Sequence, residues 1–246
     1  MNVLSIFSWG LILQGIALVH FFQRRPDSFW LWPIIFLGPL GAAAYIVIEV
    51  VPDLGLLRQS FDSFGRKKRI RYLEAVVLQN PAAGNYEELA DLYLDEGRFA
   101  RARECYDRAI SARTNHPDPF YRRGIAEIQL GDFEAAVRDL EWVTARDSKY
   151  DSYRAMALLA HACGKVGQTG KADALFAQAT EFSTASETFF NYASFLVATG
   201  RPHEARQWAE QILAKKPTMP RYLRRLERPW FRKAAALIKA LPRSTE

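Results

Sequence analysis

The most restrictive feature of this sequence is a short segment that recurs four times at nearly constant spacing. Each copy begins with a glycine and has an alanine five residues later, and successive glycines are 34, 36 and 33 residues apart. A unit of this length cannot bury its apolar face alone, so successive copies must stack into a solenoid. The copies are GRFARA (97–102), GDFEAA (131–136), GQTGKA (167–172) and GRPHEA (200–205).

Apolar residues recur with helical periodicity on both sides of each glycine, which predicts a helix, a turn and a second helix in every copy. We expect Gly97 in the left-handed conformation, because one helix must end there and the chain must reverse. Ala90 and Ala102 are expected where two helices cross, since small side chains let backbones approach closely. The periodic positions of the first copy are Leu89, Ala90, Tyr93, Phe99, Ala102, Tyr106 and Ala109.

This order of small residue, aromatic, glycine, alanine, aromatic, alanine and a late proline resembles the tetratricopeptide repeat over residues 83–217. The resemblance implies an all-α fold with an α-solenoid of about four helix-turn-helix repeats. Thr169 and Pro202 depart from the family pattern, and residues 69–81 read as the second helix of a preceding half copy. The alternative, an irregular helical bundle with chance glycines, does not explain four matched frames.

Two apolar runs, 3–22 and 29–48, contain no acidic, lysine or arginine residue. Each is about 20 residues long, enough to cross a bilayer, so residues 1–52 are predicted to form a transmembrane helical hairpin that anchors the chain. A cleaved signal peptide is disfavoured because Met1 and Asn2 supply no positive n-region. A buried soluble hairpin is disfavoured because neither run has a polar face.

The second run, with FLGPLGAAAY at 36–45, resembles the two-span segment that precedes the catalytic domains of phospholipase D-type and cardiolipin synthase-type proteins. The resemblance implies an anchor and carries no chemistry with it. The family's catalytic pattern of histidine, one residue and lysine is absent, since none of the four histidines has lysine two positions later.

Basic residues beside the apolar runs predict a topology. The loop between the runs holds Arg24 and Arg25, whereas six basic residues follow the second run within 58–71. The positive-inside rule then places both termini and the repeats in the cytoplasm of a multi-pass bacterial inner-membrane protein. Residues 53–82 are predicted to be a basic juxtamembrane linker and partial repeat. The residues expected to touch the lipid bilayer and its anionic headgroups are Arg66, Lys67, Lys68, Arg69 and Arg71.

The net charge of +6 is unevenly distributed. Residues 82–214 hold fifteen basic and twenty acidic residues, whereas 215–246 hold ten basic and two acidic ones. A nucleic-acid binder usually spreads its basic surface over the binding domain itself, so nucleic acid is not expected as a partner. Cys105 and Cys163 have no paired spacing and are expected to be small apolar residues in a reducing compartment. No metal or cofactor is expected.

Two patterns invite an enzymatic interpretation. GKVGQTGKA (164–172) has Lys165 where a phosphate loop requires its first glycine and Ala172 where it requires a hydroxyl, so an enlarged turn between helices is favoured. His161 and Lys165 lie one helical turn apart without a third, orienting group, which does not make a catalytic pair. We therefore expect no enzyme activity.

In tetratricopeptide arrays the first helix of each repeat lines a groove for a peptide or protein partner. Glu87 and Asp91 stand where one subclass has the lysine and asparagine that clamp the C-terminal carboxylate of chaperones, and their charge would repel such a ligand. A segment with basic and aromatic residues fits better. The predicted groove residues are Glu87, Asp91, Asp95, Tyr121, Ile125, Gln129, Arg154, His161, Lys165, Phe190 and Ser194.

The C-terminal segment, 218–246, places apolar residues at helical spacing among basic ones. Repeat arrays need a terminal helix to cover the last apolar surface, so a basic capping helix is the first interpretation. A basic amphipathic helix on a membrane surface or on an acidic partner is the alternative.

Taken together, these patterns predict a membrane-anchored protein–protein interaction adaptor or scaffold that confines its groove to the bilayer plane. An accessory or assembly subunit of a membrane complex that acts through the hairpin is the structural alternative. A lipid-modifying membrane enzyme is the enzymatic one.

Overall fold

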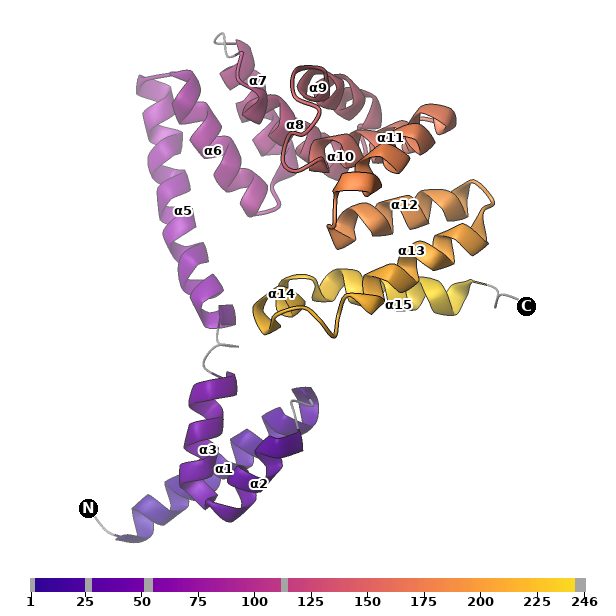
Figure 1. Ribbon diagram of the computed structural model, residues 1–246. Helices are drawn as coiled ribbons and strands as arrows, with labels where there is room; N and C mark the ends of the chain where they lie inside the picture. Colours follow the sequence, from indigo (N-terminus) through magenta and orange to yellow (C-terminus); the bar gives the residue numbers. More distant parts are fainter. Residues whose placement is uncertain (1–2, 25–27, 51–54, 112–114, 242–246) are drawn as a thin grey trace. The chain divides into compact units, whose positions relative to one another are not determined.

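The computed structural model describes residues 3–24, 28–50, 55–111 and 115–241, and every regular element within these ranges is a helix (Figure 1). The chain folds as two compact units, Met1–Arg69 and Ile70–Glu246. Helix α5 (Gly55–Gln79) runs across this boundary. Each unit is described separately below.

The first unit packs one long helix, α1 (Val3–Arg24), against a chain of shorter elements. Its core consists of buried apolar side chains that come from both parts. Gln14 Nε2 donates a hydrogen bond to the Ile34 carbonyl oxygen at 2.9 Å. The shorter elements are the 3₁₀ turn η1 (Ser28–Trp30), α2 (Leu31–Phe36), α3 (Gly38–Tyr45) and the π-helical turn η2 (Ile46–Val50).

The second apolar run is broken between α2 and α3. Gly38 has φ +55°, a left-handed conformation that ends α2, and Pro39 lies in the first turn of α3. A Cβ atom added to Gly41 would lie 1.8 Å from the Pro33 carbonyl oxygen, so the bend also requires a glycine there. Helices α2 and α3 are therefore only six and eight residues long.

The predicted transmembrane hairpin is not supported. Within the described ranges, no helix combines the length and the apolar character that a membrane crossing requires. Residues 29–48 are divided among short elements, and α1 carries polar Gln14 and His20. This finding contradicts the predicted multi-pass inner-membrane localisation, and it leaves the predicted bilayer and headgroup contacts unsupported. Within the predicted 1–52 anchor, residues 1–2, 25–27 and 51–52 lie outside the described residues.

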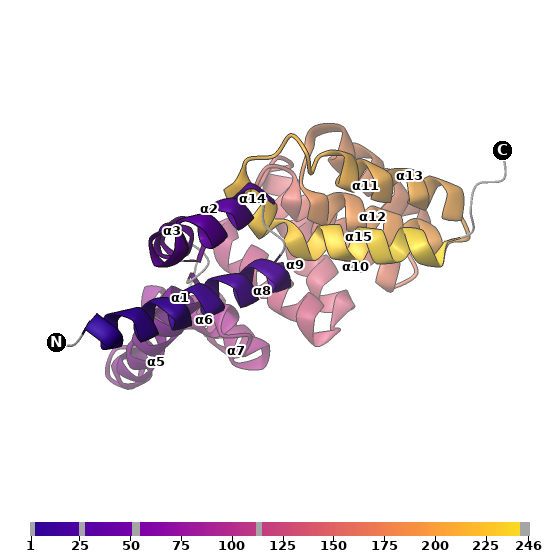
Figure 2. The ribbon, with the colours of Figure 1, turned by 90° about the horizontal axis from the view of Figure 1, so that it is seen from below.

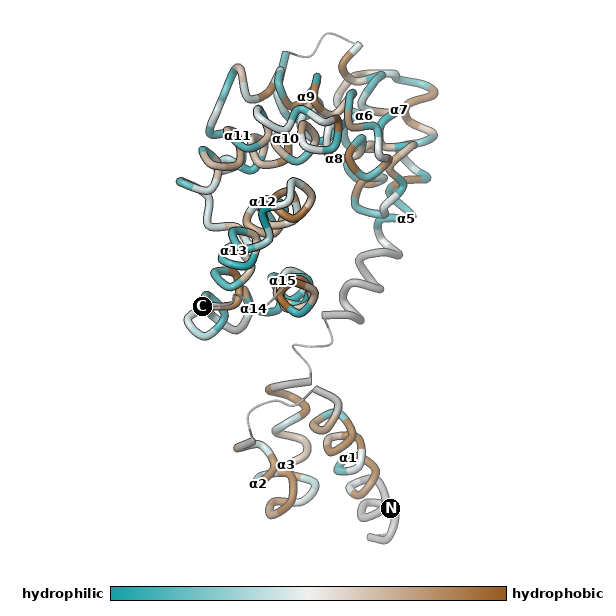
Figure 3. Tube along the Cα trace, turned by 90° about the vertical axis from the view of Figure 1, so that its right-hand side faces the viewer, coloured by the Kyte–Doolittle hydropathy of each residue, from teal (hydrophilic) through white to brown (hydrophobic). Residues whose placement is uncertain are grey.

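The second unit contains four pairs of helices joined by short turns, as the glycine spacing predicts. In Figures 1 and 3 the pairs follow one another along an arc. Each pair packs against the next, so the core is continuous from repeat to repeat. The pairs are α6 (Ala83–Asp95) with α7 (Phe99–Ser111), α8 (Pro117–Leu130) with α9 (Phe133–Arg146), α10 (Arg154–Lys165) with α11 (Thr169–Phe182), and α12 (Ser186–Ala198) with α13 (Pro202–Ala214).

The four turns share one geometry. The recurring glycine has φ between +71° and +82° in every copy. The residue after the glycine donates its amide N–H to a carbonyl five residues earlier, as from Asp132 to Glu127 at 2.9 Å. This pattern is the Schellman motif, in which a left-handed residue satisfies the last carbonyls of a helix. The glycines are Gly97, Gly131, Gly167 and Gly200.

Small residues hold the two helices of each pair close together. The alanine five residues after each glycine is fully buried in all four copies. A Cβ atom added to Gly124 would lie 3.0 Å from the Leu140 side chain, so this crossing has little room even for alanine. The crossing alanines are Ala102, Ala136, Ala172 and Ala205.

Single helices cover both ends of the array. On one side, Ile70 and Leu73 of α5 pack against the apolar side of α6. On the other, Phe231 and Ala234 of α15 (Arg228–Ala240) pack against α12 and α13, beside which α15 lies in Figure 2. Arg206 of α13 donates to the carbonyl oxygens at the end of α15, at 2.9 and 3.1 Å. The short α14 (Arg221–Leu226) precedes α15.

The turn geometry gives a direct test. Gly131→Ala should lower the free energy of unfolding by about 1 kcal/mol, because alanine is strained at φ +78° while nothing lies within 4 Å of the added Cβ. The matched control is Gly170→Ala in α11, where the added Cβ also meets nothing and φ is not positive. Urea denaturation should show no loss for the control. Equal losses in the two variants would contradict the proposed role of the turn.

Candidate partner-binding face

The predicted groove residues lie on the first helices of the four repeats, α6, α8, α10 and α12. Contacts between side chains connect these helices in order along one side of the array, which we call the first-helix face. Arg122 of α8 lies 3.5 Å from the Asp91 carboxylate of α6. Arg154 of α10 contacts Tyr121 of α8 at 3.2 Å and Glu187 of α12 at 2.7 Å. The face is therefore continuous across all four repeats.

The first repeat places three carboxylates on this face. Asp91 accepts a hydrogen bond from the Tyr106 hydroxyl at 2.6 Å in addition to its ion pair with Arg122, so its charge is largely used within the fold. Asp95 is exposed and Glu87 is half-buried. Burial, followed by the neighbouring charge of Asp91, raises the pKa of Glu87 above its ordinary value of 4.5. Glu87 and Asp95 form no hydrogen bond or ion pair with the described residues.

Tyr121 is a packing residue and not a contact surface. Its side chain is only 6% exposed, and its hydroxyl donates to the Asp151 carboxylate at 2.5 Å. Burial, followed by the hydrogen bond to Asp151, raises the pKa of Tyr121. Arg154 is likewise committed to internal partners, since it binds Glu187 and lies 3.5 Å from Asp151. The positive charge of Arg154 in the middle of the face is thus neutralised by carboxylates of the fold itself.

An unusual backbone segment supports this network. Asp151, Ser152 and Tyr153 all have positive φ, between +49° and +66°, immediately before α10 begins. Such residues cost on the order of 1 kcal/mol or more each, and they persist where the surroundings fix them. Here two ring contacts do so, since Tyr150 packs edge-on against Tyr121 and Tyr153 stacks on Phe182. The sequence pattern gave no sign of this left-handed turn.

The central positions present mixed chemistry. Ile125 is half-buried against the core, while Gln129 and Lys165 are exposed. The His161 ring lies edge-on to Phe133 with centroids 6.1 Å apart. Burial, followed by the charge of Lys165, lowers the pKa of His161 below 6.5, so the imidazole is neutral at physiological pH.

The aromatic end of the predicted groove is partly covered by α15. The Phe190 ring faces Trp230 with centroids 5.7 Å apart, and Lys233 Nζ lies 4.3 Å from the Trp230 centroid and 5.6 Å from that of Phe190. Ser194 donates its hydroxyl to the Phe190 carbonyl oxygen. The structure therefore places Lys233, which was not among the predicted groove residues, beside the last of them.

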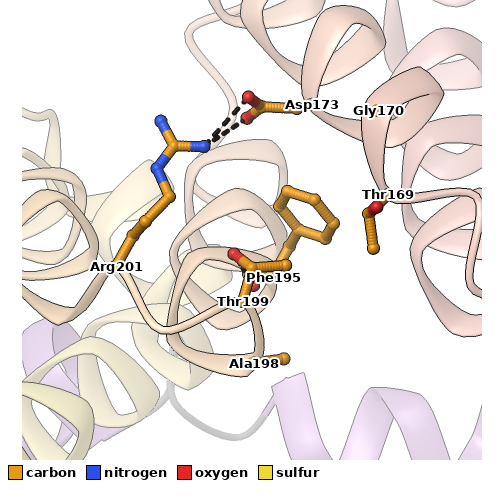
Figure 4. A pocket seen from close by; sticks show the side chains of 7 residues that line it. All are labelled: Thr169, Gly170, Asp173, Phe195, Ala198, Thr199 and Arg201. Carbon is orange, nitrogen blue, oxygen red and sulfur yellow. Dashed lines mark hydrogen bonds and ion pairs between the residues drawn. The ribbon is translucent and has the colours of Figure 1, made fainter.

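A shallow pocket of about 490 Å³ lies at the turns of the third and fourth repeats (Figure 4). Arg201 binds both oxygens of Asp173 at 2.9 Å, and it also pairs with Glu204. Its cation is therefore already matched by carboxylates. Helix α10 and a turn precede Thr169. A phosphate loop would instead follow a β-strand, so the structure does not support one here. The pocket is lined by Thr169, Gly170, Asp173, Phe195, Ala198, Thr199 and Arg201.

Among the described residues, no three side chains that could bind a metal ion lie close together. Cys163 is buried and Cys105 is half-buried, and burial raises the pKa of Cys105 to about 11, so this thiol is not activated.

The basic residues that the sequence predicted at a lipid surface all lie on α5. Arg66 is half-buried there, and Lys67, Lys68, Arg69 and Arg71 are exposed.

The second repeat hides a charged cluster that we did not predict. Arg123 binds Asp139 through two nitrogens at 2.6 and 2.7 Å and Asp107 of the first repeat at 2.7 Å. Glu127 is only 4% exposed, and its Oε2 has no hydrogen-bond partner. Burial, followed by the charge of Asp139, raises the pKa of Glu127 to about 8.

A sequence signal for this cluster exists. Arg123 and Glu127 stand eight and four residues before the turn glycine Gly131. The other three copies have apolar or aromatic residues at both positions, so a charged pair there departs from the repeat. Those residues are Leu89 and Tyr93, Leu159 and Cys163, and Tyr192 and Leu196.

Comparison with known proteins identifies the repeats. Models of the tetratricopeptide repeat match residues 89–161 and 187–211. The chain carries tetratricopeptide repeats. A search of the curated proteins found no match.

Several solved structures share the fold, and two of the three cited here, YrrB and the Parabacteroides merdae protein, are described as tetratricopeptide repeat proteins. MamA from Desulfovibrio magneticus RS-1, residues 41 to the end, is 17% identical, with a TM-score of 0.58 over 67% of this chain and 93% of MamA. YrrB, described as having an unusual peptide-binding site, is 16% identical, with a TM-score of 0.54 over 67% of this chain and 84% of YrrB. A tetratricopeptide repeat protein from Parabacteroides merdae is 16% identical, with a TM-score of 0.55 over 84% of this chain and 88% of that protein. At these identities the likeness shows the fold alone.

The polar network makes a testable contribution to stability. Tyr121→Phe should lower the free energy of unfolding by about 1 kcal/mol, because it removes the hydroxyl that donates to Asp151 and accepts from Arg154. Tyr222→Phe is the matched control, since that side chain is 70% exposed. Urea denaturation of the two variants measures the difference. A loss of the same size in both would mean that the network adds nothing.

The buried Glu127 predicts a pH dependence. Its pKa is raised in the folded chain from 4.5 to about 8, so the folded state holds the proton more tightly and the free energy of unfolding falls as pH rises through this window. Glu127→Gln mimics the protonated group. The variant should match the unaltered chain at about pH 4 and exceed it by about 1–3 kcal/mol at about pH 9.

Urea denaturation across this pH range measures the effect of Glu127→Gln. Glu134→Gln, at an exposed position of α9, is the control and should keep the pH dependence of the unaltered chain. An unchanged pH dependence in Glu127→Gln would show that Glu127 does not carry it.

Proposed function

We propose that this chain is a non-enzymatic adaptor that holds a peptide or protein partner on the first-helix face. The observation that carries the proposal is the continuity of this face. Contacts join α6, α8, α10 and α12 in order, while Glu87, Asp95, Gln129 and Lys165 on the same helices have no hydrogen-bond or ion-pair partner among the described residues.

The fold supports a role in binding. Because each repeat packs against the next, the side chains of the face are held in fixed order before a partner arrives, which lowers the entropy cost of association. A segment laid along the face contacts several repeats at once, so weak contacts add up. YrrB, which shares the fold, has a peptide-binding site according to its description, and we propose peptide or protein binding for this chain as well.

The first repeat disfavours one class of partner. Glu87 and Asp91 have carboxylates at the positions where a chaperone-tail receptor has its lysine and asparagine. A terminal carboxylate placed there would meet like charge. Recognition of a C-terminal chaperone tail is therefore not proposed.

Site-specific photocrosslinking in the full chain tests the proposal. A photoreactive amino acid at Gln129 or Lys165 samples the first-helix face at exposed positions, which avoids the buried Tyr121. The same amino acid at Glu134 or Arg138, both exposed on α9, samples second-helix positions as matched controls. We expect discrete partner adducts from the first pair and not from the second.

The pattern of adducts decides the result. Adducts of the same size and yield from all four positions would show that this face is not the binding surface. Loss of the Gln129 adduct on addition of an excess of the unlabelled chain would show that the interaction is saturable.

A further inference from the structure

Apart from Lys165 of the third repeat, the charges of the first-helix face that have no ion-pair partner among the described residues lie near its two ends. In the middle, Arg154 is matched by Glu187 and Asp151, and Arg122 is matched by Asp91. These pairs cancel locally and leave little field for a partner. The charges that remain available therefore decide which partner the face selects.

The first repeat forms the acidic end. Glu87 and Asp95 lie on α6, and neither forms an ion pair with the described residues. Burial raises the pKa of Glu87 most, and the negative charges of Asp91 and Asp118 raise it further. A cationic side chain placed here would relieve that repulsion.

Helix α15, within the basic C-terminal segment that the sequence predicts, adds a positive charge that was not among the predicted groove residues. Phe231 and Ala234 fix its orientation, because both are buried against the fourth repeat. Lys233 reaches the Phe190 ring on α12, so it extends the first-helix face beyond the last repeat. Lys233 is exposed and forms no ion pair with the described residues. Lys165 of the third repeat adds an exposed positive charge between the two ends.

We propose that the first-helix face selects a partner segment with segregated charge, in which lysine or arginine residues lie against Glu87 and Asp95 and carboxylates lie against Lys233. This inference rests on the proposed adaptor function and names the chemistry of its partner. The short apolar part of the segment lies over the central positions, where Ile125 is half-buried. Because the two ends differ in sign, the face also fixes the direction in which the segment binds.

Uniformly charged ligands fit this face less well. A polyanion, such as nucleic acid, gains from Lys233 but meets Glu87 and Asp95. A uniformly basic peptide has the opposite problem at α15. Like charges brought together at an interface cost more than one surface ion pair returns. Charge order therefore discriminates among partners more strongly than net charge does.

The length of a suitable segment follows from the fold. The face crosses from α6 through α8, α10 and α12 to α15. With neighbouring helix axes about 10 Å apart, these steps cover at most about 40 Å. An extended chain of about 12 residues spans that distance.

Binding of synthetic peptides to the full chain tests the proposal. The probe is a fluorescent peptide of about 12 residues with lysines at one end, glutamates at the other and an alanine and leucine stretch between them. A second peptide has the same composition with alternating charges, a third has only lysine as its charged residue, and a fourth has only glutamate. Fluorescence anisotropy at low salt should show the segregated peptide binding about tenfold more tightly than the other three.

Charge-reversed variants locate the interaction. Glu87→Lys combined with Asp95→Lys should weaken the segregated peptide about tenfold and strengthen the all-glutamate peptide, because both ends then attract carboxylates. Lys233→Gln should weaken the segregated peptide, because it removes the positive charge that lies beside Phe190 and Trp230. Glu134→Lys, at an exposed position of α9, is the matched control and should change neither affinity.

The outcomes separate this inference from the adaptor function. Equal affinity for all four peptides, or no binding of any of them at about 1 mM, would overturn the charge-segregated partner. If the Gln129 and Lys165 adducts persist in that case, the first-helix face still binds a partner, by shape and apolar contact. If the adducts are also missing, the adaptor function fails as well.

Discussion

The solenoid depends on the close approach of two helices within each repeat. Fully buried alanines after the turn glycines allow that approach, and Gly124 serves the same purpose at a crossing where an added methyl group would press on Leu140. Larger side chains at these crossings would separate the helices and open the core to water. The stacking of one repeat on the next, and hence the order of the first helices along a common face, follows from this local contact.

Much of the repeat region was predictable because its signals are local. Turn glycines, crossing alanines and periodic apolar residues each act within a few residues, and the structure has the left-handed glycines and the helix pairs where the pattern puts them.

For the N-terminal region, the prediction from length and apolarity was wrong. The length and apolarity of 29–48 were read as one span, whereas Gly38 and Gly41 fold the run into short elements, in which Figure 3 colours the hydrophobic residues brown.

The candidate site was less predictable, because its properties arise between repeats. The resemblance to the tetratricopeptide repeat placed Tyr121 and Arg154 on the first helices, but only the fold shows that they bind Asp151 and Glu187 within the molecule. Residues 151–153 form a left-handed turn without a glycine, so the sequence contained no glycine signal from which to predict this turn. Lys233 joins the face only because α15 packs against the fourth repeat, a contact between distant parts of the sequence.

The charged cluster of the second repeat bears on how interchangeable the repeats are. Tandem arrays arise by duplication, and apolar contacts between copies tolerate exchange because any copy can pack on any other. Arg123 is different, since it requires Asp107 from the copy before it and Asp139 from its own. Moving the second copy elsewhere would keep the pair with Asp139 but lose the partner from the preceding copy, at a cost of about 1 kcal/mol or less for a contact with a half-exposed carboxylate. The array is therefore an ordered sequence of non-equivalent modules, in which ion pairs such as Arg123–Asp107 match one copy to the copy before it.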